Sequence, residues 1–308
     1  MKVLTGKQRG KRIRQSWQLY IMILLPLTHL LIFAYYPLYG LNIAFKNYTV
    51  GSMGDAEWVG FANFTRFFSA FNFWEILGNT FFLAVYSLII GFPVPIMLAL
   101  GLNAVQNKYF RKTVQMLTYA PYFISTVVLV GIMMQIFAPR IGLIDQIGMA
   151  LGNPSRNIMA DPNAFYSLYV WSGIWQSAGY SSIIYIAALA SVPPELHEAA
   201  LIDGASRWKR IVHIDLPEIM PTAMTLLIIS VGNMVSSISF EKAFLLQNQL
   251  NLSKSEVLGT FIYKQGLASV IPDYGYGAAI GIFQSLIGIC LILMANAIVK
   301  RVNQQNIW

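Results

Sequence analysis

The chain has 308 residues, of which 56% are hydrophobic and only 11% are charged, and its formal net charge is +8. Soluble domains carry roughly 25% charged residues, so these proportions favour a protein embedded in lipid. The single cysteine excludes an intrachain disulfide, and one Cys with three His cannot build a structural zinc site.

Residues 1–17 form a basic segment in front of the first apolar stretch, and six of them are Lys or Arg. The apolar run from Leu19 to Tyr39 is too long for the hydrophobic region of a signal peptide. No cleavage site of the A-x-A type follows it. We therefore expect an uncleaved first membrane span that begins directly after a cytoplasmic N-terminal segment.

Long apolar stretches recur along the rest of the chain. A bilayer core of about 30 Å requires roughly 20 apolar residues per helix. Six stretches meet this length: 18–39, 79–103, 114–138, 165–190, 219–240 and 277–299. They predict an all-α, polytopic membrane protein with six transmembrane helices, within a membrane domain over 18–300 and followed by a cytoplasmic tail, 301–308. In the second stretch, Pro93 and Pro95 are expected to kink the helix.

Lys and Arg are distributed unevenly between the stretches. With the N-terminus inside the cell, the inside segments hold 14 basic residues and the longer outside segments hold seven. The positive-inside rule therefore places both termini in the cytoplasm. Because the basic excess follows the membrane topology, we do not expect nucleic acid as a partner.

The first outside segment contains an aromatic-rich stretch, FANFTRFFSAFNFWEILG at 61–78. Its polar residues are scattered among the rings. This composition predicts an interfacial helix lying at the membrane surface in contact with lipid, with Trp58 and Trp74 as anchors.

The densest group of mixed charges lies between the fourth and fifth stretches, in ELHEAALIDGASRWKRIVHIDLPE at 195–218. Pro193-Pro194 ends the fourth span, and proline is well tolerated in the first turn of a new helix. We expect a short helix over 195–202, which Gly204 would terminate.

A second short helix is expected over 206–214, with Ser206 as its N-cap and Pro217 as its end. The apolar faces of two such short helices are too small to form a core of their own. The cytoplasmic loop over 193–217 therefore predicts docking to a partner surface.

This loop resembles the EAA loop of type I ABC-importer permeases, whose pattern is E-A-A-x-x-D-G-A-x(8)-I-x-L-P. The matching residues are Glu198, Ala199, Ala200, Asp203, Gly204, Ala205, Ile214, Leu216 and Pro217. The resemblance to carbohydrate-importer permeases extends over nearly the whole chain. Residues 239–267, SFEKAFLLQNQLNLSKSEVLGTFIYKQGL, are similar to the LplB-type branch, which is associated with oligosaccharides in Gram-positive bacteria.

The resemblance implies a MetI-like permease fold in the plasma membrane and several partners. These are a second permease in a heterodimer, two ATPase subunits, and an extracytoplasmic solute-binding lipoprotein that delivers the oligosaccharide. In this family the loop lies in a groove on an ATPase subunit. Closure of the ATPase pair on ATP then switches the pathway from inward-facing to outward-facing.

The chain lacks the phosphate-binding motif G-x-x-x-x-G-K-[ST], because Gln8 follows its Gly6-Lys7 pair and Arg12 follows its Gly10-Lys11 pair, where the motif requires Ser or Thr. We therefore expect a transport subunit rather than an enzyme, with no cofactor of its own. ATP and Mg²⁺ would be bound by the partner ATPase.

Polar residues of the fourth and fifth spans are candidates for a substrate path, because polar groups at membrane depth normally face the bundle interior or water. Aromatic faces and hydrogen-bonding groups also suit sugars. The candidates are Trp175, Gln176, Tyr180, Asn233, Ser237 and Glu241, and Lys242 follows at the outer end of the fifth span. Hydrogen bonding between helices and an aromatic membrane belt explain each of these residues equally well.

Other functions are less well supported by the sequence. His197-Glu198 begins like the zinc-protease motif H-E-x-x-H, but Leu201 occupies the place of the second ligand. A six-span secondary transporter would need a coupling-ion site such as paired carboxylates, and the spans hold almost none away from their ends. An ABC permease for another organic solute remains the alternative to an oligosaccharide permease.

Overall fold

The computed structural model describes residues 16–49, 51, 56–236, 238 and 240–303, and these residues contain helices but no β-strand. The all-α prediction is therefore confirmed. Most of the basic segment 1–17 and the last five residues of the tail 301–308 lie outside the described residues. In chain order the helices are α2 (Trp17–Leu30), η1 (Leu31–Tyr35), η2 (Tyr36–Phe45), α3 (Ala62–Phe68), α4 (Phe73–Gly91), α5 (Pro93–Ala104), α6 (Lys108–Tyr119), η4 (Ala120–Phe123), α7 (Thr126–Ile136), α8 (Leu143–Ala150), η5 (Ile158–Ala160), α9 (Pro162–Ala190), α10 (Pro194–Ile202), α11 (Arg207–Arg210), η6 (Ile211–Asp215), α12 (Leu216–Asn233), α13 (Phe240–Leu246), α14 (Leu252–Ser255), α15 (Leu258–Gly266) and α16 (Tyr274–Asn303).

Among the described residues, four helices are long and apolar enough to cross a membrane. They are Trp17–Phe45, Phe73–Ala104, Arg207–Asn233 and Tyr274–Ala297. The bent pair of α6–η4 and α7 makes a fifth when its two halves are counted as one span. The fourth predicted span, 165–190, corresponds to α9, which is long enough at 29 residues but carries many Ser and Gly residues and is not among these candidates. The chain is thus a multi-pass membrane protein, and a crossing by α9 stays a prediction.

Two predicted spans are divided in the structure. The second is not among them, because Phe92, directly before Pro93, keeps helical angles and Phe73–Ala104 forms one long helix, so the kink expected at Pro93 and Pro95 stays a prediction. The third, predicted as a single span over 114–138, is bent by 101° between η4 and α7. Pro121 interrupts the helical hydrogen bonds there, and Ser125 caps the new helix by accepting the Val128 N–H at 3.3 Å.

The fifth predicted span, 219–240, is also wrong in its bounds. Its helix α12 ends at Asn233, and α13 begins only at Phe240. The intervening sequence is rich in Ser and β-branched residues, which favour non-helical backbone more than an apolar count suggests. This break separates Lys242 from the transmembrane helix and places it on a separate element.

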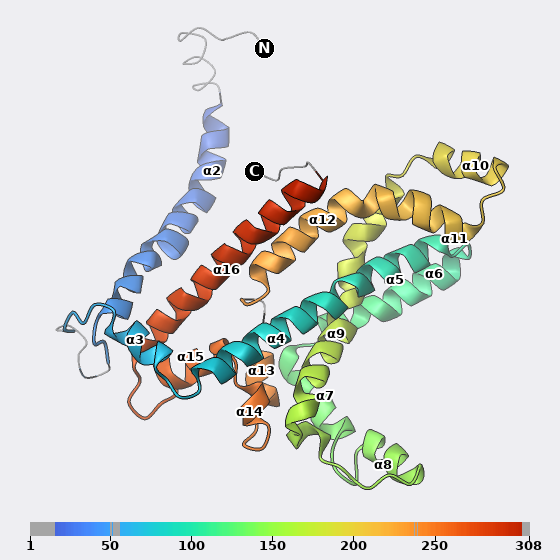
Figure 1. Cartoon of the computed structure of the whole chain (residues 1–308). Coiled ribbons are helices and arrows are strands. Elements are labelled where there is room, and N and C mark those ends of the chain that lie inside the picture. The colour runs from blue at the N-terminus through green and yellow to red at the C-terminus, as the bar shows by residue number, and fades with distance from the viewer. Residues whose placement is uncertain (1–15, 50, 52–55, 237, 239, 304–308) are drawn as a thin grey trace, which may run out of the picture.

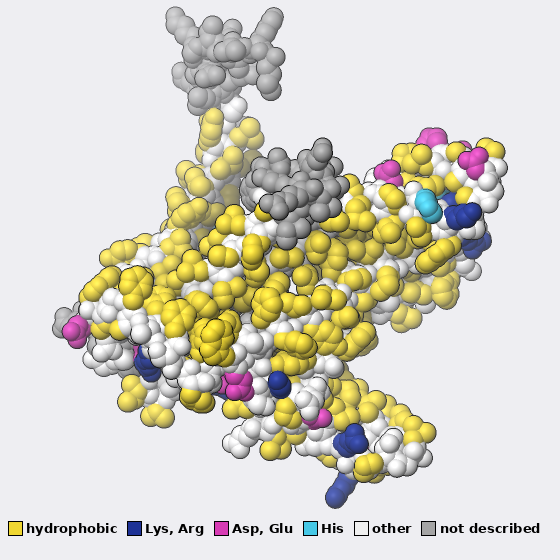
Figure 2. Space-filling model, in the orientation of Figure 1, with side chains coloured by type: hydrophobic (Ala, Val, Ile, Leu, Met, Phe, Trp, Pro, Cys, Tyr) yellow, Lys and Arg dark blue, Asp and Glu magenta, His cyan; other side chains and the backbone are white. Residues whose placement is uncertain are grey.

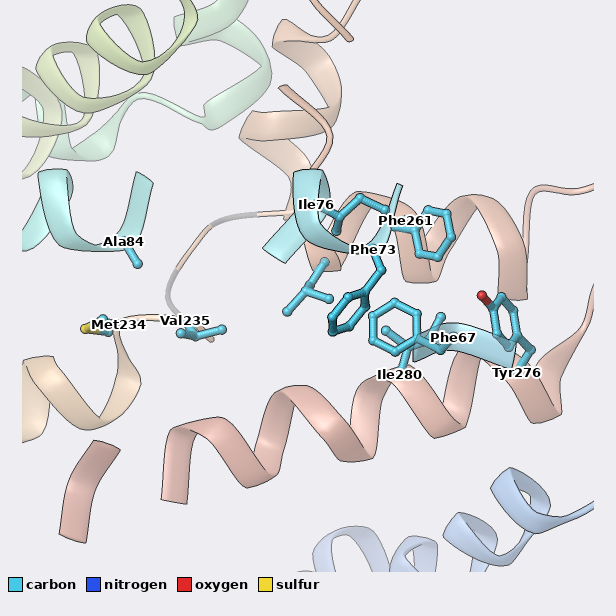
Figure 3. Packing of buried hydrophobic residues seen from close by; sticks show 10 residues of the cluster. Phe67, Phe73, Ile76, Ala84, Met234, Val235, Phe261, Tyr276 and Ile280 are labelled. Atoms are coloured by element: carbon cyan, nitrogen blue, oxygen red, sulfur yellow. The ribbon is translucent and has the colours of Figure 1, made fainter. Parts of the chain in front are cut away.

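A core of aromatic and aliphatic side chains joins α3, α4, α15 and α16 at one end of the molecule (Figure 3). Phe67 and Ile76 are each only 1% exposed. The predicted interfacial stretch 61–78 therefore comprises α3 and the first turns of α4, and part of it is buried. Trp58 and Trp74 remain exposed, as membrane anchors would be.

Helix α9 lies in the middle of the bundle and packs against α4, α5, α6 and α12. Two further hydrophobic clusters hold it there, one with α4, α7 and α13 and one with α5 and α12. By contrast, the window of high hydropathy in the first span has no buried residue. That span touches the remainder mainly where η2 meets α16, so its surface is left for lipid or another chain.

The start of α2, the end of α16 and the α10–α11 loop lie toward one side of the molecule, whereas α8 and α14 lie toward the other (Figure 1). A broad hydrophobic surface occupies the space between these sides (Figure 2). Charged side chains gather over α10 and α11 and again near α8 and α3. This distribution is expected for a molecule whose middle lies in a bilayer.

Candidate functional site

The predicted cytoplasmic loop begins with a helix that is capped at its C-terminus. Helix α10 runs from Pro194 to Ile202, and Gly204, whose φ of +74° lies in the left-handed region, follows two residues later. The Ala205 N–H donates to the Ala200 carbonyl at 2.8 Å, and the Gly204 N–H donates to the Leu201 carbonyl at 3.1 Å. These two bonds form a Schellman motif, which requires a left-handed residue at the position of Gly204. The predicted role of this glycine as a helix terminator is confirmed.

The second half of the loop differs from the prediction. Ser206 does cap α11, because its Oγ accepts the Lys209 N–H at 3.4 Å. Pro217, however, does not end a helix. It lies in the first turn of α12, and α11, η6 and α12 form one continuous helix. The wide π turn of η6 lies directly before the proline, where it accommodates the missing N–H and the bulk of the ring.

A polar contact joins the two halves of the loop. His197 Nε2 lies 3.3 Å from Asp215 Oδ1, and Asn103 Nδ2 donates to the same oxygen at 3.5 Å. Asp215 is only 4% exposed. The contact ties α10 to the helix that enters the membrane and to the end of α5. Sequence reasoning missed Asn103 and Asp215, because neither residue belongs to a recognisable motif and they are 112 positions apart.

The nine residues that match the loop pattern lie on a projecting surface. None is buried, and Glu198, Ala199, Asp203, Gly204 and Pro217 are exposed. Large apolar side chains beside them are exposed too: Ile202 by 87% and Trp208 by 72%. Such a surface of mixed charge and exposed apolar groups is suited to docking against another protein.

A cavity of about 840 Å³ lies between α4, α5, α9, α12 and α13. Of the predicted path residues, Gln176, Tyr180 and Asn233 line it. Trp175 and Glu241 are exposed and do not belong to its lining, and Ser237 lies outside the described residues. Sequence reasoning missed Tyr122, because it lies at the bend of the third span and nothing in its neighbourhood indicates an interior position.

The cavity wall combines aromatic faces with hydrogen-bonding groups. The rings of Tyr122 and Tyr180 are stacked, with centroids 3.9 Å apart and planes inclined by 5°. Gln176 Nε2 donates to the Ile124 carbonyl at 2.7 Å, which ties α9 to the bend between η4 and α7. Amides, hydroxyls and ring faces together can hold a polar organic solute, and sugars are one such class.

The described residues contain no group of three or more His, Cys, Asp or Glu that could hold a metal ion. The cavity and the loop are linked through α12, which begins at the loop and whose Asn233 reaches the cavity. The arrangement is that of a membrane transport component, with a docking surface at one end of a helix and a solute cavity at the other.

Comparison with known proteins agrees with this arrangement. Residues 91–304 match the family described as the binding-protein-dependent transport system inner membrane component, and the chain belongs to this family. It is therefore a permease subunit of an ABC importer and not an enzyme, as the sequence predicted.

Two relatives from Bacillus subtilis (strain 168) are similar over almost their whole length. Protein LplB is 36% identical over 296 residues, which cover 96% of this chain and 92% of the relative. The polygalacturonan/rhamnogalacturonan transport system permease protein YteP is 37% identical and covers 99% of this chain and 96% of the relative.

A crystal structure of a bacterial ABC transporter involved in the import of the acidic polysaccharide alginate contains a chain of the same fold. That chain is 36% identical, with a TM-score of 0.87, and the match covers 96% of this chain and 99% of that one. The predicted MetI-like permease fold and the predicted branch of the family are both confirmed.

Proposed function

We propose that this chain moves oligosaccharides into the cell as one of two permease subunits of an ABC importer. The observation that carries the proposal is the cavity between α9 and α12, where the stacked Tyr122 and Tyr180 lie beside Gln176 and Asn233. Tyrosine rings offer flat apolar faces to pyranose rings, and the amides offer donors and acceptors to their hydroxyls. The carbohydrate substrates for which relatives are named support the same class.

Movement of the solute would be driven through the loop 193–217. We infer that an ATPase subunit, which also holds the ATP and Mg²⁺, receives this loop in a groove. Glu198 and Asp203 are exposed for polar contacts, and the small Ala199 and Ala200 permit close approach. Gly204 sets the angle between the helices of the loop.

We infer that the remaining pattern residues pass movement of the docked loop on to α12. They are Ile214, Leu216 and Pro217, together with the partly buried Ala205. Because α11, η6 and α12 are continuous, a shift of the loop would move α12 as a unit. Asn233 at the far end of α12 lies in the cavity, so the same shift would reshape the solute site.

The proposed assembly contains a second, different permease, two ATPase subunits and an extracytoplasmic solute-binding lipoprotein. One structure of the alginate transporter was solved with a periplasmic protein bound to an alginate pentasaccharide, which supports a binding protein as the delivering partner. We place the chain in the plasma membrane of a Gram-positive bacterium, with both termini in the cytoplasm.

Reconstitution of the complete transporter tests the proposal. We expect ATP hydrolysis to be stimulated when the cognate binding protein carries an oligosaccharide, and uptake into proteoliposomes to require ATP. Stimulation only by a different kind of organic solute would overturn the oligosaccharide assignment. Uptake driven by an ion gradient without ATP would contradict the coupling mechanism.

A further inference from the structure

A lysine forms part of the cavity wall. Lys242 in α13 is only 4% exposed, and it belongs to the cavity lining. Its Nζ donates to the backbone carbonyl of Tyr169 at 2.7 Å and lies 4.7 Å from the centroid of the Tyr169 ring. The break after α12 thus directs a cationic side chain back into the bundle, against α9.

The backbone of α9 leaves room for this ammonium group. A Cβ atom on Gly173 would lie 3.1 Å from Lys242 Nζ, which is closer than most Cβ contacts. Glycine at this position therefore allows the charged end to lie directly against the helix. These contacts fix the position of the Lys242 ammonium group, whereas a lysine exposed to water could move freely.

The described residues that line the cavity include no Asp or Glu. The carbonyl and the ring of Tyr169, which the ammonium contacts, carry partial negative charge. Electrostatic interactions are also stronger in a partly enclosed, low-dielectric space than in water. The cavity is therefore better matched to a solute with an anionic group than to a neutral one.

We propose that the solute is an anionic oligosaccharide, whose carboxylate or sulfate group pairs with Lys242 during passage. This inference rests on the proposed function and adds the charge of the substrate. The stacked Tyr122 and Tyr180 would carry a sugar ring, and Gln176 and Asn233 would bind its hydroxyls. A pair between an ammonium and a carboxylate or sulfate is a charge-assisted hydrogen bond, which discriminates strongly against a neutral analogue.

Matched sugars test the inference in the complete transporter in proteoliposomes with its cognate binding protein. The probes are oligogalacturonates, the same oligomers as neutral methyl esters, and sulfated galactan oligomers of similar length. We expect uptake of an acidic oligomer to exceed uptake of the ester, and Lys242→Gln to lower the acidic uptake about tenfold or more. The ratio of acid to ester should fall in this variant, which separates selection by the permease from selection by the binding protein.

Two further variants make the result specific. Lys264→Gln removes a lysine that pairs with Glu256 at 2.9 Å outside the cavity lining, so it should keep the wild-type ratio. Gly173→Ala should crowd the ammonium and lower the ratio without removing the charge. It also tests the inference if the Lys242 variant fails to assemble.

The two proposals fail in different ways. An unchanged ratio in both the Lys242 and Gly173 variants, or uptake of neutral sugars alone, would overturn the anionic site and leave the oligosaccharide function intact. Stimulation by no saccharide, acidic, sulfated or neutral, would overturn the oligosaccharide function and the anionic site together. Preference for the sulfated probe over the carboxylate would identify which anion the site binds.

Discussion

Gly204 has a positive φ of +74°, and a Cβ atom at this position would have open space around it. The restriction therefore comes from the backbone alone, since left-handed conformation costs an ordinary L-residue roughly 1–2 kcal/mol. We predict that Gly204→Leu assembles in the membrane but loses ATP-driven uptake, because the angle between α10 and α11 changes. Gly204→Asn should retain much more uptake, because Asn tolerates this conformation. Equal uptake by both variants would contradict a backbone role.

The contact of His197 with Asp215 makes a separate prediction. Without His197, the buried Asp215 carboxylate loses a polar partner, and α10 loses its contact with the continuous helix of η6 and α12. We therefore expect α10 to be held less firmly against that helix. We expect His197→Ala to lower the amount of solute moved per ATP hydrolysed and to speed hydrogen exchange over α10. His213→Ala is the control, since His213 is exposed and its Nδ1 lies 2.9 Å from the backbone carbonyl oxygen of Lys209, four residues earlier in the same helix. A wild-type transport ratio in His197→Ala would show that the contact does not transmit movement.

Local chemistry explains which loop residues could be predicted. The cap at Ser206 and the terminator at Gly204 depend on neighbours within a few positions, so sequence rules identify them. The contact of Asn103 with Asp215 depends on how α5 and η6 pack, and no local pattern encodes it. Lys242 is similar. After an apolar stretch, a lysine resembles a charge at the end of a span, and only the break after α12 turns it inward.

At the scale of elements, hydropathy identified the membrane segments but did not show where a segment bends. The third predicted span has the length and apolar content of a straight helix, yet it bends by 101°. A count of apolar residues does not register Pro121 or the cap at Ser125, although both are visible in the sequence. The bend matters for function, because it brings Tyr122 to the cavity wall beside α9.

Residues 138–157, which include α8 and are called the arm below, are held together by one buried carboxylate, and this leads to a third prediction. Asp145 accepts hydrogen bonds from the Ser155 hydroxyl, the Arg156 N–H and the Arg140 N–H. These bonds hold the pKa of Asp145 below its ordinary value of 3.8. Because the folded-state pKa is lowered, the stabilising contribution is present above pH 3.8 and is lost as the pH falls through the folded-state value.

We expect Asp145→Asn to loosen this arm at neutral pH, because a neutral amide replaces the charged acceptor of three hydrogen bonds. Faster hydrogen exchange and proteolysis over 138–157 would show the effect, with exchange in α16 unchanged. Asp161→Asn offers a control, because Asp161 is exposed and lies outside the arm. Its Oδ1 accepts the Asn163 N–H and so caps the start of α9. Equal protection of the arm in both variants would contradict the role of Asp145.

The whole molecule has two sides, and its proposed mechanism depends on which side faces the cytoplasm. The α10–α11 loop lies on the side where α2 begins and α16 ends, and α8 lies on the opposite side (Figure 1). The excess of Lys and Arg predicts that the loop side faces the cytoplasm, where ATP is available. The α8 side would then meet the binding protein.

Cysteine labelling tests this orientation, because the chain contains one cysteine, Cys290. In a Cys290→Ala background, we predict that Asn153→Cys reacts with a membrane-impermeant maleimide in intact cells. Ser206→Cys should react only after the cells are permeabilised, although both native residues are exposed. The cysteine-free chain controls for background. Labelling of Ser206→Cys in intact cells would place the loop outside, where it could not reach a cytoplasmic ATPase, and the coupling mechanism would fail with the topology.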